Sequence, residues 1–413
     1  MRVAIVGTGV SGLVVAHHLH RTHDLALFEA EARIGGHVHT VDVESGGRSF
    51  AVDTGFIVFN EENYPNLTRL FAELGVASRP STMSFSVKDE RSGLEWNGSS
   101  LDRIFAQRSN LLRPSFHGML ADLLRFRRES RELLEPGPGE PTLAEFLAAR
   151  GYARAFVEDC IVPMGASIWS ADPAAVERFP ARTFARFFHN HRFLETDQPN
   201  WRTVEGGSRT YLEPLVRPFR DRIRTSTPVE RIRRAPDAVE LTPRGGAPER
   251  FDAVVVATHS DQALRMLADP TPAEREVLGA FGWQENDVRL HTDVSVLPNA
   301  RKAWGAWNYL VPAAEAGRPL LTYDMNRLQG LDAPETFCVS LNMGARVDPA
   351  RTRLRVDSAH PSFSVASVRA QARRAEVSGV NRTHYAGAWW GYGFHEDGVN
   401  SALAVVRELG GRA

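Results

Sequence analysis

One short pattern at the N-terminus restricts the fold of this chain more than any other feature. Residues 2–6 are mostly apolar and predict a buried strand, and Gly7-Thr8-Gly9-Val10-Ser11-Gly12 follows them directly. Residues 13–21 have the spacing of a helix, and residues 25–29 predict a second strand. Strand, glycine turn, helix and strand in this order predict a βαβ unit that begins a Rossmann-like α/β domain.

Each glycine of this turn has its own physical task. Gly7 permits the tight turn, Gly9 lets the backbone approach a pyrophosphate, and Gly12 lets the helix pack closely against the strand. Unpaired amides and the positive end of the helix dipole then face the phosphates. Glu29 ends the second strand, where its carboxylate can accept hydrogen bonds from both ribose hydroxyls. Together these residues predict a dinucleotide site.

The segment after Glu29 bears on which dinucleotide binds. Gly35 and Gly36 are adjacent and come just past the ribose site, so the backbone can pass close under an extended cofactor. Arg33 is within reach of the pyrophosphate. The alternative is an ordinary loop after the second strand.

The length and the order of segments predict two domains. A chain of 413 residues exceeds one core of ordinary size. The strand-rich blocks at residues 1–75, 205–260 and 361–413 predict a discontinuous nucleotide-binding domain. The blocks between them, residues 76–204 and 261–360, mix amphipathic helices with aromatic strand-like segments. They predict a mixed α+β substrate domain that is inserted twice.

Composition and charge exclude several classes of partner. The formal net charge of -1 gives no basic excess for nucleic-acid binding. Cys160 and Cys338 lie far apart, which favours neither a disulfide framework nor a thiolate zinc site. The histidines of the first helix lack accompanying carboxylate or cysteine ligands, so no metal is expected.

The first apolar run starts too early to follow a signal-peptide n-region, and no apolar stretch is long enough to span a membrane, so we expect a cytoplasmic protein.

Several separated motifs resemble the flavin amine oxidase superfamily, which also contains phytoene desaturases and protoporphyrinogen oxidases. The matching pieces are Gly7 to Gly12, Glu29, Arg33-Ile34-Gly35-Gly36, Val52-Asp53-Thr54-Gly55-Phe56, the strand end at residues 254–258 and Tyr385-Ala386-Gly387. Residues 257–264 and 387–398 look like a bacterial subgroup of predicted NAD/FAD-binding proteins. That subgroup is often encoded beside methyltransferases similar to cyclopropane-fatty-acid synthase.

The resemblance implies a bound FAD that lies extended, with its ring between the two domains. Val229 would contact adenine, and Gly36, Gly55 and Phe56 would lie near the ribityl chain or the ring. The amides of Gly398 and Val399 would face the flavin N1 and stabilise its negative charge when reduced. The full set of expected FAD-binding residues is Gly7, Gly9, Val10, Ser11, Gly12, Glu29, Ala30, Arg33, Gly35, Gly36, His37, Thr54, Gly55, Phe56, Val229, Ala257, Thr258, Gly387, Ala388, Gly398 and Val399.

The chain departs from the superfamily pattern at four points. Ala388 stands where an acid commonly binds the ribityl hydroxyls, and His37 stands where an arginine commonly follows the double glycine. No cysteine occurs near the C-terminus to attach the flavin, so FAD is expected to be held without a covalent bond. Amine oxidases often place a lysine near the flavin N5, and only Lys88 and Lys302 occur in this chain.

Three residues are candidates for catalysis. His395 could give or take a proton, because an imidazole titrates near neutrality, although a structural histidine is at least as common. Glu396 precedes the last helix, where the default role of an acid is N-capping. His259 follows a buried strand at its carboxyl end, where ligands sit in open α/β sheets.

These observations predict FAD-dependent hydride transfer, as desaturation, oxidation or isomerisation, at a carbon-carbon bond of a small apolar or lipid-like substrate. The alternatives are an FAD-dependent amine oxidase and a non-catalytic lipid-binding protein of the same fold. Arginine-rich helices at residues 101–135 are compatible with peripheral membrane contact, although a solvated helical face is the commoner reason for such a sequence. The sequence does not identify the electron acceptor, which could be oxygen or another carrier.

Overall fold

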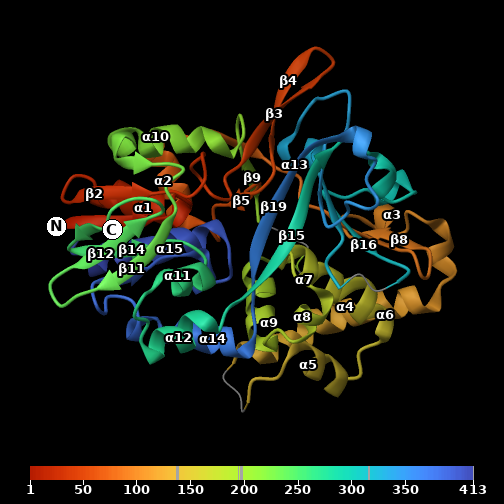
Figure 1. The fold of residues 1–413 in the computed structure, drawn as a ribbon. Helices are drawn as coiled ribbons and strands as arrows, with labels where there is room; N and C mark the ends of the chain where they lie inside the picture. The colour runs from red at the N-terminus through yellow and green to blue at the C-terminus, as the bar shows by residue number, and fades with distance from the viewer. Residues whose placement is uncertain (136–138, 194, 196–198, 315–316, 413) are drawn as a thin grey trace.

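The protein consists of two parts that lie side by side in a computed structural model (Figure 1). The structure describes residues 1–135, 139–193, 195, 199–314 and 317–412. Both termini lie in the part that holds the parallel sheet, and the other part is built on a larger, mainly antiparallel sheet. The predicted α/β architecture is therefore confirmed.

The first part is organised around a five-stranded parallel sheet. Its order is β10 (Ile223–Arg224), β2 (Asp24–Phe28), β1 (Arg2–Val6), β14 (Ala253–Val256) and β20 (Thr383–Tyr385). Successive residues of β1 enter different cores, with Val3 and Ile5 on one face and Ala4 and Val6 on the other. Both faces of the sheet are thus covered, which explains the continuous apolar run of its strands.

Helices cover one face of this sheet, and a small sheet with further helices covers the other. The first face packs against α1 (Val10–Leu19), α2 (Pro65–Leu74), α10 (Leu212–Val216) and α15 (His395–Glu408). The second packs against β11 (Val229–Arg234), β12 (Val239–Pro243), β13 (Glu249–Phe251), α11 (Ser260–Met266), α12 (Pro272–Gly279) and α14 (Val365–Ala372). Ala263, Val277 and Leu278 share this core with Val254. Because α11 and α12 are buried here, we propose a domain boundary near residue 281 rather than 260.

The second part contains a seven-stranded sheet. Its order is β19 (Thr352–Ser362), β15 (Gly282–His291), β18 (Cys338–Leu341), β17 (Leu321–Asp324), β16 (Trp307–Val311), β7 (Phe85–Asp89) and β8 (Leu94–Asn97). The helices of this part are α3 (Leu101–Ile104), α4 (Pro114–Glu129), α5 (Leu143–Ala149), α6 (Arg154–Phe156), α7 (Val162–Trp169), α8 (Pro173–Glu177), α9 (Ala181–Asn190) and α13 (Met325–Gln329). Its largest core is rich in phenylalanine, including Phe126, Phe156, Phe184 and Phe188.

Three elements connect the parts. The hairpin of β3 (Thr40–Ser45) and β4 (Arg48–Asp53) packs Val43 and Val52 into the core of the second part. A three-stranded sheet joins β5 (Phe59–Asn60), β9 (Trp201–Val204) and β6 (Ser78–Pro80). The long ribbon of β15 and β19 runs between the two parts (Figure 1) and pairs Gln284 with His360. This pairing places His360 at the boundary where the candidate site lies.

Candidate functional site

The glycine turn leaves an open approach to the start of α1. A Cβ atom on Gly7 would lie 2.7 Å from the carbonyl oxygen of Ala257, and one on Gly12 would lie 2.0 Å from the carbonyl oxygen of Gly7. A Cβ on Gly9 would meet nothing within 4 Å. Protein packing therefore explains Gly7 and Gly12, whereas the space over Gly9 is free for a ligand.

The first amides of α1 face this free space without partners inside the helix. The first amide bonded in the helix is that of Leu13, which donates to the Gly9 carbonyl over 3.0 Å. The preceding amides of Val10, Ser11 and Gly12 belong to the first turn, whose N–H groups have no intrahelical acceptor. This arrangement suits a diphosphate.

Glu29 is fixed at the end of β2. Its carboxylate accepts hydrogen bonds from the Thr8 amide at 2.9 Å, the Thr8 hydroxyl at 2.5 Å and the Glu31 amide at 2.9 Å. A carboxylate has about four lone-pair directions, so ribose hydroxyls can still bind. The Thr227 amide donates to the Glu29 carbonyl at 2.7 Å, which brings the start of β11, with Val229, next to Glu29 and Ala30. Adenine contact by Val229 stays a prediction.

The double glycine lies directly against the glycine turn. Gly35 forms a parallel bridge with Gly9, and a Cβ on Gly36 would lie 3.1 Å from the Gly9 Cα. Arg33 donates from one guanidinium nitrogen to the carbonyls of Gly36 at 2.8 Å and Val38 at 3.3 Å. Arg33 thus holds the loop in place, and its contact with the pyrophosphate stays a prediction.

The next residues pair with the segment after β4. The Phe56 amide donates to the His37 carbonyl at 2.9 Å, and the Thr54 amide donates to the His39 carbonyl at 2.8 Å. A Cβ on Gly55 would lie 2.0 Å from the His37 carbonyl oxygen, so only glycine fits there. Thr54, Gly55 and Phe56 therefore lie beside the double-glycine loop, and their contact with the ribityl chain or the flavin ring stays a prediction.

The last helix begins before Gly398, which changes the predicted role of Gly398 and Val399. Helix α15 starts at His395, and the Gly398 amide already donates to the Phe394 carbonyl at 3.1 Å. The free amides at this end are those of residues 395–397. Gly398 instead permits close packing, because a Cβ there would lie 2.8 Å from the Val10 side chain and 3.0 Å from the Ser11 hydroxyl.

Glu396, a catalytic candidate, has a structural role at α2, and its part in catalysis stays a prediction. One carboxylate oxygen accepts from the amide and side chain of Asn66 at 3.1 and 3.0 Å, and the other accepts from the Leu67 amide at 2.9 Å. Asn66 and Leu67 are the second and third residues of α2. Glu396 therefore caps α2. Asp397 caps its own helix by accepting from the Phe394 amide at 2.9 Å.

Four histidines from distant segments gather beyond the double-glycine loop. The ring of His37 lies 5.4 Å from that of His360 and 6.4 Å from that of His259. His259 stacks on Trp283 at 3.7 Å, and His395 stacks on Phe56 at 3.8 Å. The Nε2 atom of His395 is buried without a hydrogen-bond partner among the described residues. We call these four residues, His37, His259, His360 and His395, the histidine group.

Burial keeps the histidine group neutral. It lowers the pKa of His259 to about 4 and the pKa values of His360 and His395 to about 3. Burial also lowers the pKa of His37, although this side chain remains exposed to solvent. The site is therefore surrounded by uncharged rings near pH 7.

The C-terminal glycine segment closes one side of the site. The Gly387 amide donates to the Ser401 hydroxyl at 2.9 Å, and the indole N–H of Trp389 donates to the Thr258 carbonyl at 3.1 Å. These bonds hold Gly387 and Ala388 against the strand end at Ala257 and Thr258. Trp389 is a core residue packed on Phe281 at 4.7 Å, so it does not line the site.

Neither lysine and neither cysteine belongs to the site. The Lys88 ammonium lies near the carbonyl of Leu297, and that of Lys302 pairs with Asp102 at 3.0 Å, both at the far end of the second part. Cys160 and Cys338 are fully buried in cores of the second part, where burial raises the pKa of each thiol. The described cysteines thus offer no attachment point for a flavin.

Sequence reasoning did not single out His360 or Trp283. Neither residue belongs to a local motif, and both reach the site only because β15 and β19 pair over their whole length. The amide of Asn286 further orients His360, with 3.0 Å between Asn286 Nδ2 and His360 Nδ1. No feature of either segment by itself signals this contact.

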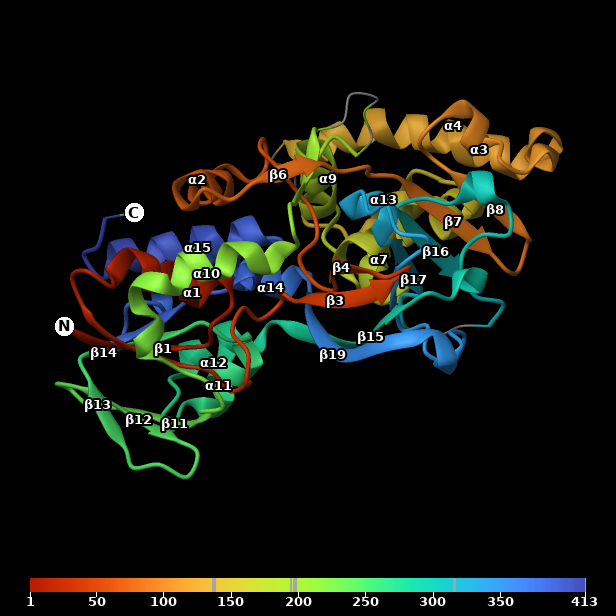
Figure 2. The same cartoon turned by 90° about the horizontal axis from the view of Figure 1, so that it is seen from above.

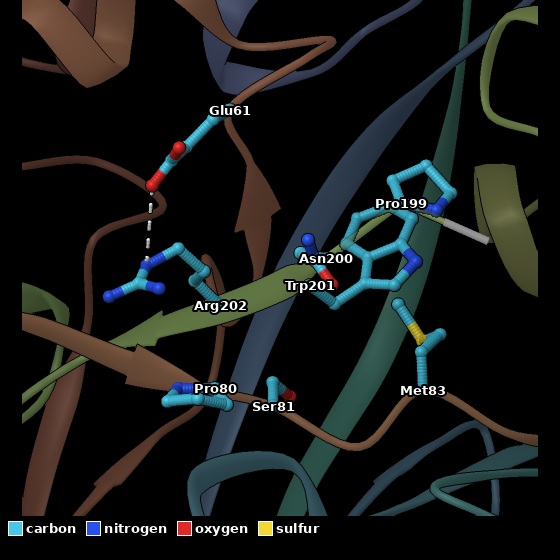
Figure 3. A pocket seen from close by; sticks show the side chains of 8 residues that line it. All are labelled: Glu61, Pro80, Ser81, Met83, Pro199, Asn200, Trp201 and Arg202. Atoms are coloured by element: carbon cyan, nitrogen blue, oxygen red, sulfur yellow. Dashed lines mark ion pairs between the residues drawn. The ribbon is translucent and has the colours of Figure 1, made fainter. Parts of the chain in front are cut away.

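A separate pocket of about 380 Å³ opens beside the small three-stranded sheet. Figure 3 shows the ion pair of Glu61 and Arg202 on one side of it and Trp201, Met83 and Pro199 on the other. The indole ring of Trp201 lies 6.4 Å from the His191 ring, which lies 6.3 Å from the Phe394 ring. Aromatic side chains thus connect the pocket wall to the residue before His395.

The fold and this site define a dinucleotide-binding oxidoreductase. The profile of the flavin-containing amine oxidoreductases matches residues 10–285. The chain belongs to this family and is an FAD-dependent oxidoreductase, which sets aside the non-catalytic alternative. No helix in the described part of the chain has both the length and the apolar character needed to cross a membrane.

Known proteins share the fold at low sequence identity. The cyclohexylamine oxidase of Brevibacterium oxydans is 17% identical over 99% of both chains, with a TM-score of 0.71. A protoporphyrinogen oxidase-like protein of Exiguobacterium is 20% identical over 99% of both chains, with a TM-score of 0.71. The fatty acid isomerase of P. acnes that produces CLA is 14% identical over 98% of both chains, with a TM-score of 0.65.

One curated relative matches over a short stretch. The chain is 37% identical over 90 residues to the lysine-specific histone demethylase 1B homolog of Caenorhabditis elegans. This stretch is 22% of the present chain and spans 10% of the length of that relative.

The residues present fit FAD. The open space over Gly9, the free amides of α1 and the carboxylate of Glu29 suit its diphosphate and ribose. The unpartnered Nε2 of His395 and the first amides of α15 offer polar contacts for its ring. When bound, FAD supplies the capacity to accept and return a hydride, while the protein orients the reactants.

Proposed function

We propose that the protein catalyses desaturation, oxidation or isomerisation at a carbon-carbon bond of an apolar, lipid-like substrate. The observation that carries this proposal is the uncharged character of the rings around the site. His37, His259, His360 and His395 are neutral near pH 7, and Phe56 adds an apolar face. Such a site binds an uncharged carbon chain without burying an unpaired charge.

The aromatic side chains between the 380 Å³ pocket and the site support the same substrate class. The ring of Phe193 lies about 6 Å from the rings of both Trp201 and Phe187. The Phe187 ring in turn lies 5.2 Å from that of Phe394. An apolar chain that enters beside Trp201 would meet apolar side chains along its length. We infer that the 380 Å³ pocket is the mouth of the substrate route.

His395 is the proposed proton carrier. Its ring is held by stacking on Phe56, and its free Nε2 can accept or donate one proton. Removal of hydride from one carbon and of a proton from its neighbour gives a double bond, and return of both at shifted positions gives an isomer.

A second candidate is amine oxidation, favoured by the family description and by Glu61 at the pocket. The carboxylate of Glu61 could receive a cationic amine at the mouth. Against this candidate, the described lysines lie away from the site.

The test is anaerobic mixing of the holoprotein with unsaturated fatty acids and, separately, with primary amines. Flavin bleaching reports net oxidation, and mass spectrometry of the recovered lipid reports a shifted double bond without bleaching. Either result with fatty acids supports the proposal. Rapid bleaching by amines, with no change in any fatty acid, would overturn it.

A further inference from the structure

Exposed leucines gather in one region of the described surface. Leu101 is 76% exposed, Leu111 51%, Leu112 86% and Leu124 67%. Leu101 begins α3, Leu111 and Leu112 end the short 3₁₀ turn η1 (Arg108–Leu112), and Leu124 lies on α4. Single exposed leucines are normal on protein surfaces, but several on consecutive turns indicate an interaction site.

Hydrogen bonds join these turns into one surface. Arg108 forms an ion pair with Asp102 of α3 and donates to the Phe105 carbonyl at 2.9 Å. The Nε2 atom of His117 on α4 lies 2.9 Å from the Leu111 carbonyl oxygen. Figures 1 and 2 both show α3 at the end of the molecule opposite the chain termini. The leucine surface, as we call α3, η1 and residues 114–124 of α4, is therefore one projecting end of the fold.

The charged side chains of this surface are mostly basic. Arg103, Arg108 and Arg113 come from its own turns, and Arg301 and Lys302 come from the adjacent turn η7 (Arg301–Ala303). Asp102 is bound by Lys302 at 3.0 Å and by Arg108. Five positive charges and one negative charge give a local net charge of about +4, against -1 for the whole chain.

Other acids near this end do not offset the excess, and Asp122 of α4, which is buried, pairs with Arg125 at 3.3 Å. Glu95 is buried, and its two carboxylate oxygens each accept a backbone amide at 2.8 Å, from Asn299 and Ala300. These hydrogen bonds hold the Glu95 carboxylate inside the protein, so it is not presented on the leucine surface.

We propose that the leucine surface docks on anionic lipid bilayers. The leucines enter the boundary between head groups and acyl chains, and the arginines bind lipid phosphates, which matches the apolar and basic character of this end. The docking is peripheral, since short turns and not a spanning helix carry it. It stands whether or not the substrate is lipid-like, because none of its residues lines the flavin site.

The test is co-sedimentation of the holoprotein with vesicles of phosphatidylcholine alone and of phosphatidylcholine with about one third phosphatidylglycerol. We expect binding to the anionic vesicles only, and a loss of binding when the salt concentration is raised about tenfold. Leu101→Asp and Leu112→Asp should each weaken binding by about tenfold, because each removes a leucine that inserts and adds a repelled charge. These side chains are exposed, so folding should be unaffected.

Val380→Asp is the matched control, since Val380 is 39% exposed but lies beside β20 in the other part of the molecule. Unchanged vesicle binding by Val380→Asp, together with the losses at Leu101 and Leu112, supports the proposal. Absence of wild-type binding to anionic vesicles overturns it. Equal binding by wild type and Leu101→Asp/Leu112→Asp also overturns it.

Discussion

The imidazole of His395 stacks on the phenyl ring of Phe56, with 3.8 Å between ring centroids and 15° between ring planes. Phe56 follows β4 near the start of the chain, and His395 begins the last helix. The contact therefore fixes a neutral imidazole between segments from opposite ends of the sequence. Burial lowers the pKa of His395 to about 3, so the ring can accept a proton at neutral pH only transiently.

Replacement of His395 by phenylalanine separates its chemistry from its packing. His395→Phe keeps an aromatic ring on Phe56 but removes the free Nε2, so substrate conversion should fall by about a hundredfold. FAD content and thermal stability should stay near those of the wild type. Single-turnover kinetics measure the change, and an unaltered rate would show that His395 only packs.

Gly9→Ala should weaken FAD binding without weakening the fold. The new methyl group meets no protein atom within 4 Å, but it occupies the space assigned to the diphosphate. The dissociation constant for FAD should rise at least about tenfold, or 1.4 kcal/mol. Fluorescence titration of apoprotein measures it. Gly118→Ala, which also meets no atom within 4 Å, is the control and should leave FAD affinity unchanged.

Glu396→Ala should destabilise the protein and leave the turnover of the folded fraction nearly intact. The change removes the acceptor for the first-turn amides of α2 at Asn66 and Leu67, which costs about 1 to 3 kcal/mol. Urea denaturation measures the loss. A large fall in turnover at unchanged stability would instead assign Glu396 to the chemistry.

Stability should fall in mild acid because of the histidine group. The pKa of His360 is about 3 in the folded protein against 6.5 for the ordinary group, so the unfolded chain binds more protons between these values. The neutral His360 ring makes its full contribution to stability above pH 6.5, and this contribution is lost as the pH falls from 6.5 towards 3. The free energy of unfolding should therefore fall between pH 7 and 5 by about 2 kcal/mol less in His360→Gln than in the wild type. Parallel urea curves at the two pH values measure this difference, and equal losses would contradict it.

The pocket pair of Glu61 and Arg202 should discriminate between substrate classes. Arg202→Gln should raise the KM for acidic amphiphiles about tenfold and leave kcat unchanged, because Arg202 binds the substrate at the pocket and takes no part in the chemical step. Glu61→Gln should have this effect only on amines. Steady-state kinetics with both substrate classes measure the split, and identical effects on both would remove the pocket from the substrate route.

The local sequence determined the first βαβ unit and the cofactor that it binds. Gly7, Gly9, Gly12 and Glu29 act through the backbone and the helix end within one continuous segment, so their spacing alone encodes the geometry. The pairing of residues 54–56 with the segment after the double glycine, by contrast, comes from the fold.

Tertiary structure decided the parts of the site that depend on distant contacts. Glu396 caps α2, which starts more than three hundred residues earlier in the chain, so its local setting before a helix suggested the wrong helix end. His360 reaches the site through the register of β15 and β19, and α11 and α12 join the first core through packing. Motifs specify what nearby residues can bind, whereas strand register and core packing depend on the whole chain at once.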